Sequence, residues 1–256
     1  MKKYLVLLVC MSFFACNNSP SAKDQNAKAT KEYPDNVNKV MKAHGGLDLW
    51  NSMNSMSYEM SSKVGVEKQS IDLSDRRELI EKPTFRMGYD GENYWTTADT
   101  SVNVNPVFYK NLIFYFYAMP FVAADDGIKY EEVPALDFEG VSYPGFKISY
   151  ESNIGISPED EYFIHYSPET YQMEWLGYTV TYFSKEKSNI IGWRRYNDWV
   201  DVSGLKLPNS MLRMASKDNL PVSQKSKTDF KNMMVSKDDF EDGYFSMPEG
   251  ARVVEE

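Results

Sequence analysis

The chain has 256 residues, which is enough for one well-packed domain and tight for two. Its formal net charge of −9, without a cluster of Lys and Arg, weighs against nucleic-acid binding and against attraction to anionic membranes. Cys10 and Cys16 are the only cysteines, so a domain that follows them has no disulfide, thiolate metal site or cysteine nucleophile.

The first sixteen residues have the pattern of an export signal. Residues 1–3 carry two lysines, and residues 4–15 form an apolar run that is too short for a membrane span of about 20 residues. The run ends in Phe13-Phe14-Ala15-Cys16, which resembles a bacterial lipobox and implies a lipid such as palmitate on Cys16. Cys10 is a poorer candidate, because Val9 before it is β-branched. The alternative is an ordinary signal peptide cleaved after Ala15.

Residues 17–32 are polar and lack apolar periodicity, so we expect a flexible tether between the anchor and one domain over residues 33–256. A tether of this length places the domain roughly 20 Å from the anchor. Asn17-Asn18-Ser19-Pro20 has neither an acidic run nor an Asp next to the cysteine. Compared with bacterial lipoproteins, this pattern favours the outer membrane, with the domain facing the periplasm.

The domain begins with a helical pattern. Val37, Val40 and Met41 have helical spacing, Asp35 is a suitable N-cap, and Gly45-Gly46 supplies a left-handed C-cap, which together predict a helix over 36–43. A second helical turn is expected around 47–50.

Most of the remaining chain alternates apolar and polar residues, and its aromatic content of 14 % favours β-sheet. The predicted strands cover residues 55–66, 68–74, 76–81, 84–89, 93–97, 145–151, 161–167, 172–184, 189–202, 205–216 and 221–234. Asp90-Gly91 indicates a tight hairpin. The succession of hairpins predicts an antiparallel meander, and Phe240, Phe245 and Pro248 are expected to dock the tail on the sheet edge.

Residues 106–122 differ from the rest because they are apolar on nearly every face, which predicts a buried helix between Pro106 and Pro120. A strand pair remains an alternative for part of the segment. In a helix, one face carries four apolar residues that are our candidate ligand contacts: Phe108, Leu112, Phe116 and Met119. Trp95 and Trp175 are expected on the facing sheet. The alternative is that all six fill a dry core.

The sequence offers little for catalysis. His44 and His165 lie far apart and lack zinc-ligand spacing, and no Gly-x-Ser-x-Gly or phosphate-binding loop occurs. The acidic pair Asp125-Asp126 is typical of a solvated loop. We therefore expect a protein that is not an enzyme and that holds no metal or cofactor.

Three motifs in order resemble a lipoprotein family of the Bacteroidetes type, similar to the LolA/LolB-like periplasmic lipoprotein-carrier superfamily. They are Ala43-His44-Gly45-Gly46 with Leu49-Trp50, then residues 196–208, which end in Leu205-Lys206-Leu207-Pro208, and finally Phe245-Ser246-Met247-Pro248-Glu249-Gly250-Ala251. The resemblance implies a mainly β (α+β) fold, an incomplete antiparallel β-barrel closed by short helices around an apolar cavity. Members carry lipoprotein acyl chains, bind lipids or sense ligands.

Two functions follow from these expectations. The first is a monomeric, membrane-anchored envelope lipoprotein that binds a lipid or acyl chain in the half-barrel. The alternative is a structural or protein-partner module of the cell envelope, without a small ligand, in which exposed tyrosines form the interface.

Overall fold

The computed structural model describes residues 31–62, 65–151, 157 and 159–255. The chain divides into two compact units, Met1–Glu32 and Tyr33–Glu256, and the second is described here by itself. The predicted signal peptide, Cys16 and residues 17–30 of the predicted tether lie outside the described residues.

Two helices open the unit, as the sequence predicts: α1 (Asp35–Ala43) and α2 (Leu47–Trp50). Pro34, not Asp35, is the N-cap of α1, and Asp35 lies inside the first turn, where it pairs with Lys39. The chain turns between the helices through Gly45, which has φ +113°. A Cβ at Gly45 would lie 2.6 Å from the carbonyl oxygen of Gly204, so the close packing of this corner also requires glycine.

The first group of strands forms a meander. Its members are β1 (Ser55–Ser62), β2 (Gly65–Asp72), β3 (Glu78–Glu81), β4 (Arg86–Tyr89) and β5 (Tyr94–Thr96). All five predicted strands are present. β1, β3, β4 and β5 are shorter than predicted, and β2 begins three residues and ends two residues before its predicted bounds. The hairpin predicted at Asp90-Gly91 is also present, because the Asp90 side chain accepts a hydrogen bond from the backbone N–H of Asn93 at 2.7 Å and closes the turn.

The apolar segment is helical but broken. It forms α3 (Pro106–Tyr109), α4 (Leu112–Tyr117) and the 3-10 helix η1 (Phe121–Ala124), where a single helix was predicted. Asn111 adopts φ +63° between α3 and α4, and its backbone N–H donates to Oε2 of Glu78 at 2.9 Å. Glu78 comes from β3, so the break depends on a tertiary contact that helical periodicity does not contain.

The second group of strands contains one strand that was not predicted, β6. The group consists of β6 (Ile128–Phe138), β7 (Val141–Tyr150), β8 (Tyr162–Tyr166), β9 (Met173–Tyr178), β10 (Gly192–Arg195), β11 (Trp199–Val202), β12 (Leu205–Pro208), β13 (Ser210–Lys217) and β14 (Leu220–Ser236). The predicted strands 189–202 and 205–216 are each divided in two, because β11 and β12 leave the main sheet and pair with each other as a ribbon.

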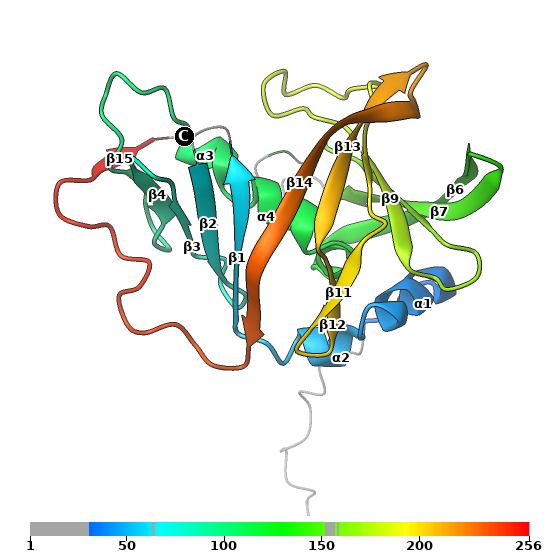
Figure 1. The fold of residues 1–256 in the computed structure, drawn as a ribbon, viewed down its shortest axis with the longest axis horizontal. Coiled ribbons are helices and arrows are strands. Elements are labelled where there is room, and N and C mark those ends of the chain that lie inside the picture. The colour runs from blue at the N-terminus through cyan, green and yellow to red at the C-terminus, as the bar shows by residue number, and fades with distance from the viewer. Residues whose placement is uncertain (1–30, 63–64, 152–156, 158, 256) are drawn as a thin grey trace, which may run out of the picture. The chain divides into compact units, whose positions relative to one another are not determined.

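Thirteen strands of the described chain form one antiparallel sheet, in the order β15-β5-β4-β3-β2-β1-β14-β13-β10-β9-β8-β7-β6, where β15 is Arg252–Val254. The two meanders join where β1 pairs with β14, with Ser55 opposite Ser236. Within the described residues the sheet is not closed, because β15 and β6 each have a strand neighbour on one side only. Figure 1 shows the sheet curving around α3 and α4, which lie behind β1 and β14 in this view.

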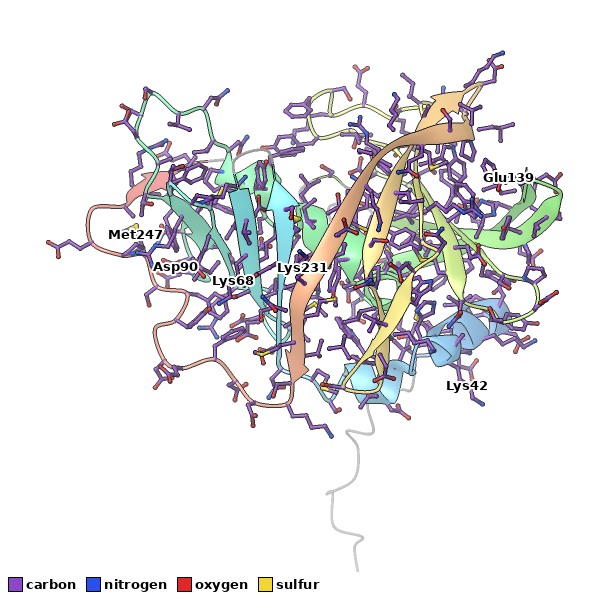
Figure 2. The ribbon with its side chains drawn as sticks, viewed as in Figure 1. Lys42, Lys68, Asp90, Glu139, Lys231 and Met247 are labelled. Atoms are coloured by element: carbon purple, nitrogen blue, oxygen red, sulfur yellow. The ribbon has the colours of Figure 1, made fainter. Side chains whose placement is uncertain are left out.

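The two faces of the sheet have different contents. The inner face, turned toward α4, carries the largest apolar cluster, which includes Tyr58, Phe116, Met119, Ile164 and Leu176. The outer face carries two smaller apolar clusters and charged residues such as the half-buried Lys68 of β2 and the exposed Lys231 of β14, both labelled in Figure 2.

The C-terminal tail was predicted to dock on the sheet edge, and it reaches that edge across the outer face of the first meander. Phe245 is buried with Leu79 and Trp95, and Phe240 packs against the same cluster. β15 then extends the sheet by pairing with β5. The tail therefore covers the outer side of the first meander, while the helices cover its inner side.

Candidate functional site: the inner face and its apolar cover

The candidate site is the inner face of the sheet together with residues 106–124, which cover it. Tyr117 of α4 packs between the two strands that join the meanders, with ring centres 4.2 Å from Tyr58 of β1 and 4.5 Å from Phe230 of β14. The phenol of Tyr196 donates to the backbone carbonyl of Phe116 at 2.8 Å. The cover is thus held by aromatic packing and a few directed hydrogen bonds.

Four of the predicted ligand contacts lie on this cover, in different environments. Phe116 and Met119 are buried in the inner cluster, and Leu112 packs against it while half-buried. Phe108 lies beyond the break in the helix, with its ring centre 4.9 Å from that of Tyr182 and 5.1 Å from that of Phe183. The four residues therefore do not share one helical face, because Asn111 interrupts the helix.

The structure does not bring Trp95 and Trp175 together with these residues. Trp95 is buried on the outer face with Leu79 and Phe245, and Trp175 is buried on the outer face with Trp193 and Tyr143. The reason is the alternation of side chains along a strand: Leu176, next to Trp175, faces the inner cluster, so Trp175 must face away.

A chain of buried polar groups crosses the inner face beside the cover. Tyr58 donates to Oε1 of Gln69 at 2.6 Å, and Gln69 donates to Oε1 of Glu67 at 2.8 Å. Glu67 also forms a salt bridge with Lys82 at 3.1 Å. Glu67 and Gln69 alternate with outward residues along β2, but nothing in their spacing separates them from solvent-facing polar residues, so the sequence did not identify this group.

Glu78 is the other buried acid of the inner face. Burial raises its pKa to about 7, against the hydrogen bond from Asn111 and the charge of Lys110, which lower it. Its Oε1 atom is buried and has no hydrogen-bond partner in the described structure. The carboxyl group of Glu78, at the point where α3 meets α4, therefore loses its proton near pH 7.

Both histidines have structural contacts. Nδ1 of His44 lies 3.2 Å from the carbonyl oxygen of Lys206, and Nε2 accepts from the backbone N–H of Met173 at 2.9 Å. Nδ1 of His165 lies 3.1 Å from the carbonyl oxygen of Tyr143. Burial lowers the pKa of each ring to about 4. Within the described part of the chain, His, Cys, Asp and Glu do not gather in a group of three that could hold a metal ion.

An exposed apolar rim lies next to α3. Phe183 is 75 % exposed although its ring packs on Phe108, and Ile190, in the same loop between β9 and β10, is 77 % exposed. Phe183 contacts the outer end of the cover through Phe108, so this exposed apolar side chain is continuous with the cover.

Comparison with known proteins identifies the fold. No protein-family model and no curated protein matches the sequence. Among solved structures, a LolA superfamily protein from Nitrosomonas europaea is 9 % identical, with a TM-score of 0.50, over 83 % of this chain and 96 % of that one. A DUF1329 family protein from Desulfovibrio piger is 9 % identical, with a TM-score of 0.50, over 82 % of this chain and 95 % of that one.

The fold therefore resembles that of the LolA superfamily protein and of the DUF1329 protein, and the resemblance that the three sequence motifs predicted is confirmed at the level of the fold. The expected mainly β architecture with an unclosed antiparallel sheet is confirmed. Of the helices in the described residues, none has the length and apolar character needed to cross a bilayer.

Proposed function

We propose that the protein is a membrane-anchored envelope lipoprotein that binds a lipid or acyl chain on the inner face of its half-barrel. The observation that carries this proposal is the cover: the inner face of an unclosed sheet is occupied by a short, separate and almost wholly apolar segment. An acyl chain offers the same kind of surface as the side chains of that segment. It can therefore insert between the sheet and the cover, and both apolar surfaces then stay out of contact with water.

In this proposal, Phe116 and Met119 mark the ligand position, and Leu112 and Phe108 line the way to it from the rim. The cover moves outward as the acyl chain enters. Lipidation of Cys16 and a tether over residues 17–32 keep the domain at the membrane, where a water-insoluble ligand can be exchanged. The proposed location is the outer membrane, with the domain facing the periplasm. The protein acts as a binder and not as an enzyme.

Native mass spectrometry of residues 31–256, exported with a cleavable signal, tests the proposal. This piece contains the whole compact unit Tyr33–Glu256. We expect adducts of lipid mass after incubation with envelope lipids. Phe183→Asp should slow their formation without unfolding the domain, because Phe183 is 75 % exposed.

Met234→Asp is the matched control, because Met234 is also exposed, at 62 %, but lies opposite Ser57 on the outer face of β14. A clean mass without adducts, unchanged by lipid extract, would refute the lipid-binding proposal. Equal slowing by Phe183→Asp and Met234→Asp would refute the role of the rim.

A second function, binding of an envelope protein partner, is favoured by one observation. β6 is an eleven-residue strand that has a neighbour on one side only in the described chain, and such an edge can pair with a strand of another protein. Glu131, Glu132 and Pro134 lie on this strand, and charges and proline oppose indiscriminate pairing. Cross-linking from β6 to one reproducible envelope protein, without bound lipid, would support this function.

A further inference from the structure

Two arginines face each other on the inner side of the sheet. Arg194 of β10 is directly opposite Arg213 of β13 in the antiparallel register. Arg194 is also opposite Leu176 of β9, which belongs to the inner cluster, so both arginine side chains leave the sheet on its inner side. Like charges placed directly opposite each other destabilise a sheet.

Neither arginine has a carboxylate partner within salt-bridge distance among the described residues. By contrast, Arg76 pairs with Asp125 at 2.9 Å, Arg77 with Asp72 at 2.8 Å, and Arg195 with Glu139 at 3.4 Å. Arg195 follows Arg194 in the chain but points to the outer face. A pair of positive charges without carboxylate partners is a local exception on a protein with a net charge of −9.

The pair lies at the boundary between the apolar interior and water. The guanidinium carbon of Arg194 is 4.4 Å from the ring centre of Phe116 and 5.8 Å from that of Tyr178. Nε of Arg194 is buried and has no hydrogen-bond partner in the described structure. Arg213 is exposed, so the pair has one member against the cover and one in solvent.

We propose that Arg194 and Arg213 bind the anionic headgroup of an amphiphile whose acyl chain extends past Phe116 into the inner face. A guanidinium presents a planar fork of N–H donors that matches the oxygens of a phosphate or carboxylate. The bound anion would supply the missing countercharge and a partner for the unpaired Nε. This inference deepens the proposed lipid-binding function and rests on it, because it names the class of ligand.

The test compares probes that share one chain and differ in the headgroup. Dodecyl phosphate, uncharged dodecyl glucoside and inorganic phosphate are titrated, below micelle-forming concentrations, into residues 31–256 and followed by calorimetry. We expect dodecyl phosphate to bind about tenfold more tightly than dodecyl glucoside, since hydrogen bonds to a charged group are worth about 1.4 kcal/mol or more. Inorganic phosphate should bind far more weakly than either amphiphile.

Arg194→Gln and Arg213→Gln should each remove most of the preference for dodecyl phosphate and leave the affinity for dodecyl glucoside unchanged. Arg195→Gln is the matched control, because it removes a positive charge one residue away on the outer face and should keep the preference. Because Arg213 is exposed and faces a like charge, Arg213→Gln should fold as well as the wild type. This variant keeps the test decisive if Arg194→Gln weakens packing on Phe116.

The outcomes separate the two proposals. If no dodecyl compound binds, the lipid-binding function itself fails. If both amphiphiles bind equally, and the Arg194 and Arg213 variants behave like Arg195→Gln, lipid binding stands and the headgroup site is refuted. If inorganic phosphate binds as tightly as dodecyl phosphate, the arginines form a site for a free anion, and the headgroup assignment is overturned.

Discussion

His44 accepts a hydrogen bond at Nε2 from the backbone N–H of Met173, 2.9 Å away, and thereby joins the α1–α2 corner to β9. With Nε2 as the acceptor, the proton of the neutral ring is on Nδ1 and points to the carbonyl oxygen of Lys206. The backbone N–H of Lys206 in turn donates to the carbonyl of His44 at 2.9 Å. One neutral imidazole therefore fixes the first helix, the main sheet and the β11–β12 ribbon together.

This arrangement predicts acid sensitivity. Burial lowers the pKa of His44 from 6.5 to about 4, so the unfolded chain binds the proton more readily than the folded one. The contribution of His44 to stability is full above pH 6.5 and is lost as the pH falls toward 4, by about 3 kcal/mol in total. Urea unfolding of the wild type and of His44→Gln at pH 7.5 and 4.5 measures this: the stability difference between them should shrink at the lower pH. An equal difference at both pH values would show that the ring titrates normally.

For Glu78 we expect the opposite dependence of folding stability on pH. Its pKa is raised to about 7 by burial, so the folded state holds the proton more tightly than the unfolded chain does. This stabilising contribution is complete below pH 4.5 and is lost as the pH rises through 7, at a cost of about 3 kcal/mol. Glu78→Gln, which keeps an acceptor for the Asn111 N–H, should exceed the wild type in stability at pH 8 and lose this advantage at pH 5. The control is Glu81→Gln on the same strand, where the side chain is 37 % exposed, and an equal pH-dependent gain in both variants would show that burial of Glu78 is not the cause.

The hydrogen bond from Tyr196 to the carbonyl of Phe116 should contribute measurably to the stability of the cover. Tyr196→Phe removes the donor to the carbonyl of Phe116 and leaves that buried oxygen without its partner, which should destabilise the domain by about 1–3 kcal/mol. Amide exchange in residues 112–124 should accelerate more than exchange in β7 and β8, because the lost bond acts on the cover. Tyr182→Phe, at a half-buried rim position, should change neither quantity. Uniform acceleration throughout the sheet would contradict a local role for Tyr196.

Steric fit at the α1–α2 corner can be tested by comparing two glycines, Gly45 and Gly91, that have similar positive φ angles. Gly45→Ala places a Cβ 2.6 Å from the carbonyl oxygen of Gly204 and should lower the free energy of unfolding by about 2–4 kcal/mol, because the steric clash adds to the conformational strain. Gly91→Ala has a similar φ of +109°, but its nearest contact would be 3.7 Å from Arg77, so only the conformational cost of about 1–2 kcal/mol remains. Thermal unfolding of both variants measures the difference, and equal losses would show that the corner relaxes.

The sequence predicted what depends on neighbours in the chain. The hairpin at Asp90-Gly91, the helix ending at Gly45 and the meander order all follow from local turn chemistry and alternation. β6 was not predicted from the sequence. It is an edge strand that is exposed on much of its surface and contains Pro134 and two glutamates, so it lacks the apolar alternation of a half-buried strand.

The features of the candidate site that were not predicted depend on contacts between segments distant in the sequence. The break at Asn111 is fixed by Glu78 from another strand. Trp175 faces outward because its neighbour Leu176 faces the inner cluster, and which of the two faces inward depends on strands distant in the sequence. Arg194 and Arg213 become neighbours only because the β11–β12 ribbon between them leaves the sheet and returns. No pattern along the chain contains that pairing.

The pairing of β1 with β14 has a consequence for how the domain is made. β1 is among the first elements of the domain to emerge and β14 is nearly the last, so the two meanders cannot join until almost the whole chain is available. Closing so long a loop costs conformational entropy before the β1–β14 contacts form, so this folding step is slow. Until it occurs, one edge of β1 is unpaired and can pair with strands of other chains. A chain truncated before β14 therefore retains an unsatisfied edge along β1, and aggregation, not a smaller stable fold, is its expected fate.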